Sequence, residues 1–187
     1  MPLPPLKDQF DALLRLPSIS CTQADLDQSN LPVVELLASW LNDLGFECRI
    51  LPIANQPGKA NLLASFGSGP GGLVMAGHTD TVPCNPERWQ HNPFALTEAN
   101  NRWYGLGSCD MKGFFPLIIE AVRSYLNQPF KHPLIILATA DEESSMSGAR
   151  ALVAADFSQA RHAIIGEPTG MRPIRLHKGI MMERIDI

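Results

Sequence analysis

The sequence has no surplus of basic residues, and this excludes proteins that bind nucleic acid through charge. Its 187 residues contain 15 Lys and Arg against 19 Asp and Glu, a formal net charge of −4. A protein that holds a phosphate backbone needs a positively charged surface, because much of the affinity comes from releasing the counterions of the phosphates. We therefore expect no nucleic-acid partner.

Long apolar runs are also missing. No segment approaches the ~18 consecutive apolar residues that indicate a membrane span. Residues 1–16 contain too many prolines and charges for a secretory signal peptide. We therefore expect no membrane partner and a cytoplasmic location.

The cysteines form no CxxC pair, and this argues against a zinc–thiolate site. Disulfides are typical of secreted proteins, and the sequence predicts no secretion signal. We therefore expect reduced thiols at all four positions, Cys21, Cys48, Cys84 and Cys109.

The apolar residues, 45% of the chain, follow the spacings of helices and strands. The expected helices cover residues 6–15, about 30–44, 114–126 and about 147–155, of which the third is apolar nearly all round and therefore expected to be buried. The expected strands cover residues 47–53, 60–66, 73–77, 134–140 and 163–166, and a small hairpin covers 95–97 and 102–104. This alternation predicts a three-layer α/β/α fold with a mixed, largely parallel sheet.

Two of these segments have further signals. Asn30 followed by Pro32 predicts a helix start with Asn30 as its cap, and Gly45 predicts a left-handed stop. The apolar run 134–140 is typical of a central strand that is covered on both faces.

Residues 67–72 match the pattern GxGxxG by letter. A dinucleotide site needs that loop to lead from a strand into a helix, so that the helix N-terminus faces the pyrophosphate. Here a strand is predicted to follow, and Pro70 lies inside the loop. We expect a tight turn between two strands instead.

Acidic and imidazole side chains follow three of the predicted strands. His78-Thr79-Asp80 follows the first, Asp141-Glu142-Glu143 the second and Glu167 the third, and a glycine-rich loop adds Asp110. Ligands of open α/β sheets bind outside the carboxyl ends of the strands, so these groups are expected to meet at one edge of the sheet.

Four carboxylates brought together repel one another unless they are protonated or bind cations. One histidine with several carboxylates suits zinc, cobalt or manganese better than calcium. The number of carboxylates favours two ions that share a bridging ligand. Two such ions ~3.5–4 Å apart can activate water and polarise a carbonyl together.

Each of these residues alone also has a plainer interpretation. His78 would be a hydrogen-bonded loop residue and Asp80 a turn residue. Glu142 and Glu143 would be a solvated helix start, Glu167 a loop end and Asp110 a helix cap. What favours the metal site is that all of them occur at strand ends or in a glycine loop.

Spacing suggests how the neighbours divide the work. In an extended chain Glu142 and Glu143 point to opposite faces, so one can bind an ion while the other acts as a general base. His78 and Asp80 share a face, so the Asp80 carboxylate can accept a hydrogen bond from the N–H of the second ring nitrogen of His78.

Four blocks carry a family resemblance: AGHTDTVP at 76–83, YGLGSCDMKG at 104–113, TADEE at 139–143 and GEPT at 166–169. They resemble the metal-site blocks of the dinuclear-zinc amidohydrolases and peptidases, which include deacetylases, desuccinylases, aminoacylases and carboxypeptidases. Further segments, LDQSN at 26–30 and SMSGAR at 145–150 among them, are most similar to members that deacetylate amino acids.

The resemblance implies two divalent metal ions, zinc first and cobalt as an alternative. His78 and Glu167 would hold one ion, Glu143 would hold the second, and Asp110 would bridge the two.

It also implies the catalytic roles. Glu142 would be the general base and Asp80 the partner of His78, in the hydrolysis of an N-acetyl amino acid. A cis peptide bond is implied after the bridging aspartate, between Asp110 and Met111.

Chains of that family are about twice as long as this one. The part that this chain lacks carries a lid and dimerisation domain and a further metal-binding histidine. Residues 1–180 are therefore expected to be the N-terminal part of the catalytic domain of a homodimeric parent, and 181–187 the start of a strand towards the absent domain. The remaining histidines do not match the missing ligand: His91, His132, His162 and His177.

Three interpretations stay open at this point. The parent is a deacetylase of an N-acetyl amino acid, or a sibling that takes another acyl group or a dipeptide. Alternatively the chain is a non-catalytic fragment that binds metal.

Overall fold

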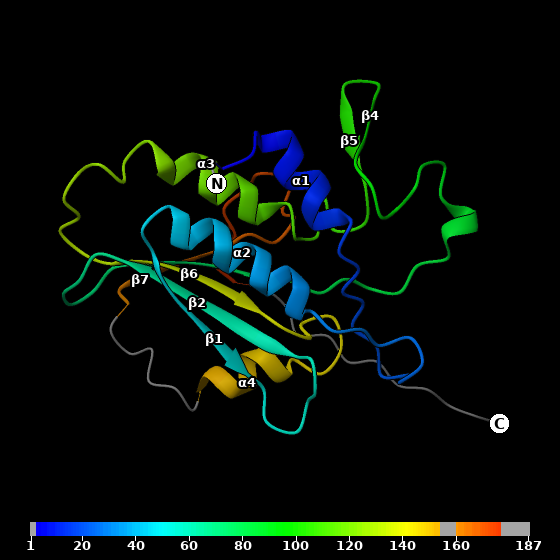
Figure 1. Ribbon diagram of the computed structural model, residues 1–187, viewed down its shortest axis with the longest axis horizontal. Coiled ribbons are helices and arrows are strands. Elements are labelled where there is room, and N and C mark those ends of the chain that lie inside the picture. The colour runs from blue at the N-terminus through cyan, green and yellow to red at the C-terminus, as the bar shows by residue number, and fades with distance from the viewer. Residues whose placement is uncertain (1–2, 154–159, 177–187) are drawn as a thin grey trace.

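A five-stranded mixed sheet organises the computed structural model, which describes residues 3–153 and 160–176 (Figure 1). Its strands are β1 (Glu47–Pro52), β2 (Ala60–Phe66), β3 (Leu73–His78), β6 (Leu134–Thr139) and β7 (His162–Ile165). The helices are α1 (Leu6–Leu14), α2 (Leu31–Asp43), α3 (Phe114–Arg123) and α4 (Ser147–Val153), with a short 3-10 turn η1 (Pro86–Arg88). A separate hairpin joins β4 (Thr97–Ala99) to β5 (Arg102–Tyr104).

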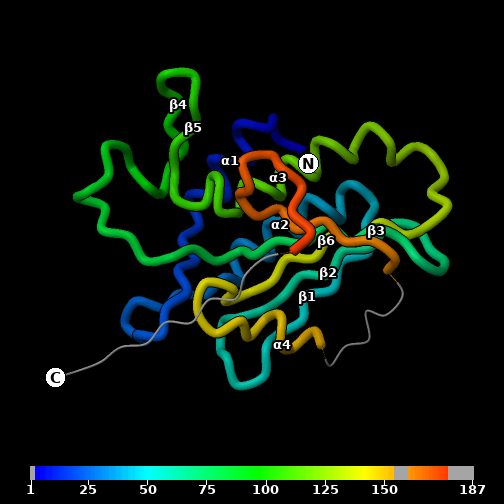
Figure 2. The backbone as a smooth tube through the Cα atoms, turned by 180° about the vertical axis from the view of Figure 1, so that it is seen from behind, coloured from blue at the N-terminus to red at the C-terminus, as the bar shows by residue number. Residues whose placement is uncertain are grey.

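The strand order β1-β2-β6-β3-β7 places β6 in the centre of the sheet, as its apolar run predicts. The β1–β2 and β2–β6 pairings are antiparallel, whereas β6–β3 and β3–β7 are parallel. The predicted mixed sheet is therefore confirmed. Because β6, β3 and β7 run the same way side by side, their carboxyl ends meet at one edge (Figure 2).

Helices cover both faces of the sheet. α1, α2 and α3 lie over one face and α4 lies on the other, so the three-layer arrangement is confirmed (Figure 1). The apolar side of α2 packs on β1 and β2 and carries six buried residues: Val33, Val34, Leu37, Ala38, Trp40 and Leu41.

The start of α2 differs from its prediction. Pro32 lies in the first turn and Gly45 takes the left-handed φ of 89°, as expected. The side chain of Asn30, however, makes no cap hydrogen bond. Its amide nitrogen instead donates buried hydrogen bonds to the backbone oxygen of Ala60 and to Thr79 Oγ1. Asn30 therefore ties the helix to the sheet.

α3 is amphipathic rather than buried all round. Phe115, Ile118 and Ile119 are buried in the core, but Leu117 is 51% exposed. The helix lies on the outside of the layer, so only the face towards the sheet and α1 is covered. The helix therefore has a solvent-exposed face although that face carries an apolar residue, and the apolar composition alone could not show which face is exposed.

The glycine-rich loop at 67–72 joins β2 to β3, so a strand does follow it. It is not a tight turn between paired strands, because β6 lies between β2 and β3 in the sheet. The loop crosses the beginning of β6 instead. Gly72 has a φ of 112°, and a Cβ there would collide with the backbone oxygen of Pro133.

Smaller differences concern the ends of elements. The first strand of the hairpin lies at Thr97–Ala99, two residues later than predicted. The expected end of α4 at residues 154–155 and the expected strand at 181–187 lie outside the described residues. All four cysteines are free thiols, as predicted. Among the described helices, none has the length and apolar character needed to cross a membrane.

Replacement of Leu37 by alanine tests the contact between α2 and the sheet. Leu37 is fully buried, so Leu37→Ala is expected to lower the free energy of unfolding by about 2–5 kcal/mol, measured by urea titration. The matched control Leu117→Ala removes a half-exposed leucine and is expected to cost less than about 1 kcal/mol. Equal losses for the two variants would contradict this packing.

Candidate metal centre

The imidazole of His78 is the centre of the acidic cluster. His78 is the last residue of β3, and its side chain is 1% exposed. Its Nε2 atom lies 3.1 Å from Asp110 Oδ1, 3.7 Å from Glu167 Oε1 and 3.9 Å from Glu142 Oε2. Residues up to 89 positions apart in the sequence (His78 to Glu167) thus meet around one ring nitrogen.

Two overlapping groups of side chains offer ligand atoms within 4.8 Å of one another. One contains His78, Asp110 and Glu143, and the other contains His78, Glu142 and Glu167. The structure therefore brings together every residue for which the sequence suggested metal binding or base catalysis. The parallel alignment of β6, β3 and β7 explains the positions of His78, Glu142, Glu143 and Glu167, because these residues lie at or just after the carboxyl ends of the three strands.

Asp110 reaches the cluster from the glycine-rich loop before α3. The peptide bond between Asp110 and Met111 is cis, as the resemblance implied. Asp110 does not cap the helix, because α3 begins at Phe114 with Gly113 in the cap position. Its side chain is 49% exposed, so its carboxylate faces the open side of the cluster.

Asp80 differs in detail from its predicted role. The Nδ1 atom of His78 lies 3.0 Å from the backbone oxygen of Asp80 and 3.6 Å from its carboxylate Oδ1, so the hydrogen bond is with the backbone. The buried Oδ1 atom of Asp80 has no hydrogen-bond partner among the described residues. The other oxygen, Oδ2, accepts a hydrogen bond of 3.0 Å from the backbone N–H of Glu143. Asp80 thereby connects the end of β3 to the turn after β6.

The cluster shifts the protonation of its members. Burial alone would lower the pKa of His78, but Asp80, Glu167 and Glu142 outweigh it and raise that pKa to about 9. Burial raises the pKa of Glu143, and the Asp110 carboxylate adds to the effect.

The pKa values of two further carboxyl groups, Glu167 and Asp80, shift in opposite directions. Burial raises the pKa of Glu167 against the opposing charge of His78. Burial would also raise the pKa of Asp80, but contact with His78 and the Glu143 amide keeps it below its usual range. A site that raises the pKa of its imidazole and of two carboxyls, Glu143 and Glu167, lacks positive charge.

A divalent cation would supply that charge. One imidazole nitrogen with several carboxylate oxygens is a donor set that zinc, cobalt and manganese accept. The residues present therefore fit a metal centre.

Comparison with known proteins identifies the family of this chain. The model of peptidase family M20/M25/M40 matches residues 74–180, which include every residue of the cluster. The chain belongs to this family. The resemblance inferred from the four sequence blocks is thereby confirmed.

Two curated M20 relatives are acetylornithine deacetylases. The one from Salmonella arizonae is 52% identical over 177 residues, 95% of this chain and 46% of that protein. The one from Klebsiella pneumoniae is 52% identical over 185 residues, 99% of this chain and 48% of that protein. The chain thus spans about half the length of these relatives.

Solved structures show the same fold at low identity. Human carnosine dipeptidase 1 superposes with a TM-score of 0.73 at 22% identity, over 86% of this chain and 37% of that one. The M20 metallo-carboxypeptidase Sso-CP2 of Sulfolobus solfataricus gives a TM-score of 0.70 at 21% identity, over 88% and 37%. The α/β/α architecture is therefore that of M20 enzymes.

Sequence reasoning missed two buried lysines near the acidic cluster. Lys112 is 1% exposed, and its Nζ donates to the backbone oxygens of Leu13 and Leu16 at the end of α1. Burial lowers the pKa of Lys112 to about 8. Its position two residues after Asp110, at the start of a predicted buried helix, was the available signal. Lys59 is also buried, and nothing in the sequence around it marks it.

Metal binding to this chain is expected to strengthen as the pH rises. With a pKa of about 9, His78 carries a proton at pH 7 that a metal ion must displace. Zinc affinity measured by calorimetry between pH 6 and 8 should rise roughly tenfold per pH unit for each proton displaced, with proton release seen as a dependence on buffer ionisation enthalpy.

The matched variants are His78→Gln, which should remove binding, and His132→Ala, which replaces an exposed histidine and should leave the pH slope unchanged. An affinity independent of pH in the unaltered chain would contradict the raised pKa of His78.

Proposed function

We propose that this chain carries the metal-binding half of an amide hydrolase that removes the acetyl group from N2-acetyl-L-ornithine. The convergence of His78, Asp110, Glu142, Glu143 and Glu167 at one sheet edge is the observation that carries the proposal. The choice of substrate rests on relatives named acetylornithine deacetylase at 52% identity. Because the chain spans 46–48% of their length, the activity is proposed for the whole protein.

The proposed cofactors are two divalent metal ions, zinc first and cobalt as the alternative. His78 and Glu167 would hold one ion, Glu143 the other, and Asp110 would be shared. The distances support a shared site, because Asp110, Glu142 and Glu167 all lie within 4 Å of His78 Nε2 and Glu143 groups with His78 and Asp110. The division into ligands and base follows the family resemblance. When bound, the ions would supply Lewis-acid activation of the acetyl carbonyl and of a water molecule.

The protein residues would move the protons. Glu142 takes a proton from the attacking water, whose oxygen bonds to the acetyl carbon. As the carbon–nitrogen bond breaks, Glu142 passes that proton to the leaving amine, and acetate and ornithine result. Asp80 keeps the imidazole of His78 oriented and holds the backbone N–H of Glu143 in place.

The proposal extends to the cellular role. The products place the reaction in arginine biosynthesis, and we propose a cytoplasmic enzyme because amino-acid precursors are made there. We also propose a homodimer, with residues 1–180 as the first part of the catalytic domain and 181–187 leading to a further domain. These assignments follow the family resemblance, and the size of the whole protein in solution would test the dimer.

Glu142→Gln in the whole protein tests the general base. Loss of the carboxylate should lower kcat by about 10²–10⁴-fold with zinc binding retained, because the residue moves protons and is not assigned to an ion. The assay is release of acetate from N2-acetyl-L-ornithine, with zinc content measured on the same sample. Glu35→Gln, an exposed position on α2, is the matched control.

Glu143→Gln should behave differently and lose zinc affinity together with activity. Wild-type rates in Glu142→Gln would remove Glu142 from the mechanism. A wild-type protein that binds zinc but releases acetate from no N-acetyl amino acid would overturn the proposed function.

The 187-residue chain by itself is expected to be nearly inactive. The resemblance implies that a further metal-binding histidine comes from another part of the parent. Acetate release by the chain and by the whole protein, each with zinc or cobalt added, compares the two directly. Substantial turnover by the chain alone would show that its own ligands complete the centre.

A further inference from the structure

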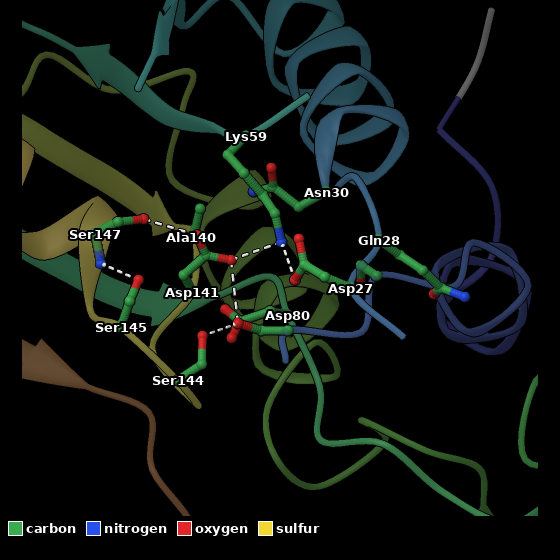
Figure 3. Close-up of polar contacts among 12 residues, drawn as sticks. Asp27, Gln28, Asn30, Lys59, Asp80, Ala140, Asp141, Ser144, Ser145 and Ser147 are labelled. Atoms are coloured by element: carbon green, nitrogen blue, oxygen red, sulfur yellow. Dashed lines mark hydrogen bonds and ion pairs between the residues drawn. The ribbon is translucent and has the colours of Figure 1, made fainter. Parts of the chain in front are cut away.

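Asp141 belongs to the same acidic run as Glu142 and Glu143, yet its side chain is used elsewhere. It is 3% exposed and faces the interior, where both carboxylate oxygens are occupied. Oδ1 accepts hydrogen bonds from Lys59 Nζ at 2.7 Å and Ser20 Oγ at 3.1 Å, and Oδ2 accepts one from Ser147 Oγ at 2.7 Å (Figure 3). The residue directly before the proposed base is therefore anchored.

Lys59 is the cation of this anchor. Its side chain is 3% exposed, and its Nζ lies 2.7 Å from Asp141 Oδ1 and 2.8 Å from Asp27 Oδ1 (Figure 3). Burial alone would lower the pKa of Lys59, but the two carboxylates outweigh it and leave that pKa raised. The lysine thus stays charged between its partners.

The backbone of Asp141 shapes the turn that presents the acids. Its φ of 56° lies in the left-handed region, which non-glycine residues rarely adopt without support. Its carbonyl oxygen accepts hydrogen bonds from Ser144 N at 3.4 Å and Met146 N at 2.6 Å. Glu142 and Glu143 lie inside this closed turn, so their direction depends on how Asp141 is held.

The anchor also reaches the segment between α1 and α2. Asp27 accepts a hydrogen bond from the backbone N–H of Cys21, and the N–H of Ser20 donates to the backbone oxygen of Thr81. One lysine therefore links this segment, the start of β2 and the turn after β6. The same segment borders Asp80, which holds the other side of that turn.

We propose that Lys59 and Asp141 form a positioning pair for the acidic centre. Lys59 and the two serine hydroxyls fix the Asp141 carboxylate, and Asp141 in turn fixes the turn that points Glu142 and Glu143 at His78. The inference rests on the proposed function for its catalytic consequence. Its structural consequence, an ordered turn, can be measured without metal or substrate.

Hydrogen exchange of the metal-free chain gives the first test. In Lys59→Met the amides of Glu143, Ser144 and Met146, which close the turn, should exchange at least tenfold faster. Amides of the β2–β6 ladder should keep their rates, and Lys59→Arg should restore the turn because a charged donor remains. The matched control is Lys7→Met, which breaks an exposed ion pair with Glu98. Unchanged exchange of the turn amides in folded Lys59→Met would overturn the proposal.

A double variant covers the case in which Lys59→Met leaves too much uncompensated charge to fold. Lys59→Met with Asp141→Asn removes both charges of the inner pair, and Asp27, whose side chain is 30% exposed, can be solvated. The turn amides should again exchange at least tenfold faster. A folded double variant with wild-type exchange in the turn would overturn the positioning role.

Kinetics of the zinc-loaded whole protein give the second test. Per mole of folded protein, Lys59→Met should lower kcat by about 10–100-fold with KM within twofold, and Lys59→Arg should recover most of it. A rise in KM at constant kcat would count against the pair. A wild-type protein without deacetylase activity would remove the proposed function, and the exchange result would still decide whether the pair orders the turn.

Discussion

The parallel register of β6 with β3 puts Ala138 opposite Gly77 and Thr139 opposite His78, so the two strands end level with each other. β7 joins the other side of β3 in the same direction. Glu142, Glu143 and Glu167, which follow these strands, therefore lie close to His78, whereas Asp141 is directed into the interior. The short distances from His78 to Glu142 and Glu167 follow from this alignment, and the loop before α3 adds Asp110.

Such an alignment concentrates negative charge, and cationic groups lie on two sides of it. In the acidic cluster, His78, whose pKa is raised, lies beside the carboxylates of Asp110, Glu143 and Glu167. Together these side chains form a donor set suited to divalent metals. On the inner side, Lys59 neutralises Asp141, the one acid of the run that points inward. The run of three acids is thus divided by burial, since Asp141 lies in the interior and Glu142 and Glu143 lie in the acidic cluster.

The sequence predicted most elements because their apolar spacing is strong, and it predicted the cluster because acids at the ends of parallel strands must converge. Its errors have a common cause. The Asn30 side chain bonds to β2 and Thr79 instead of capping its helix, and Leu117 faces solvent on an apolar helix. The loop at 67–72 crosses the beginning of β6, because β2 and β3 are consecutive in the chain but are not neighbours in the sheet. In each case the tertiary arrangement, which local spacing does not show, decided the outcome.

By itself, the sequence determined the α/β class, the acidic and imidazole side chains at the strand ends and the family, because local spacing and short motifs are present along the chain. Only the tertiary structure decided that β6 inserts between β2 and β3, that His78 bonds to the Asp80 backbone oxygen, and that Lys59 holds Asp141. These features depend on pairing across dozens of residues, where burial and hydrogen-bond geometry select one partner among several that the sequence allows.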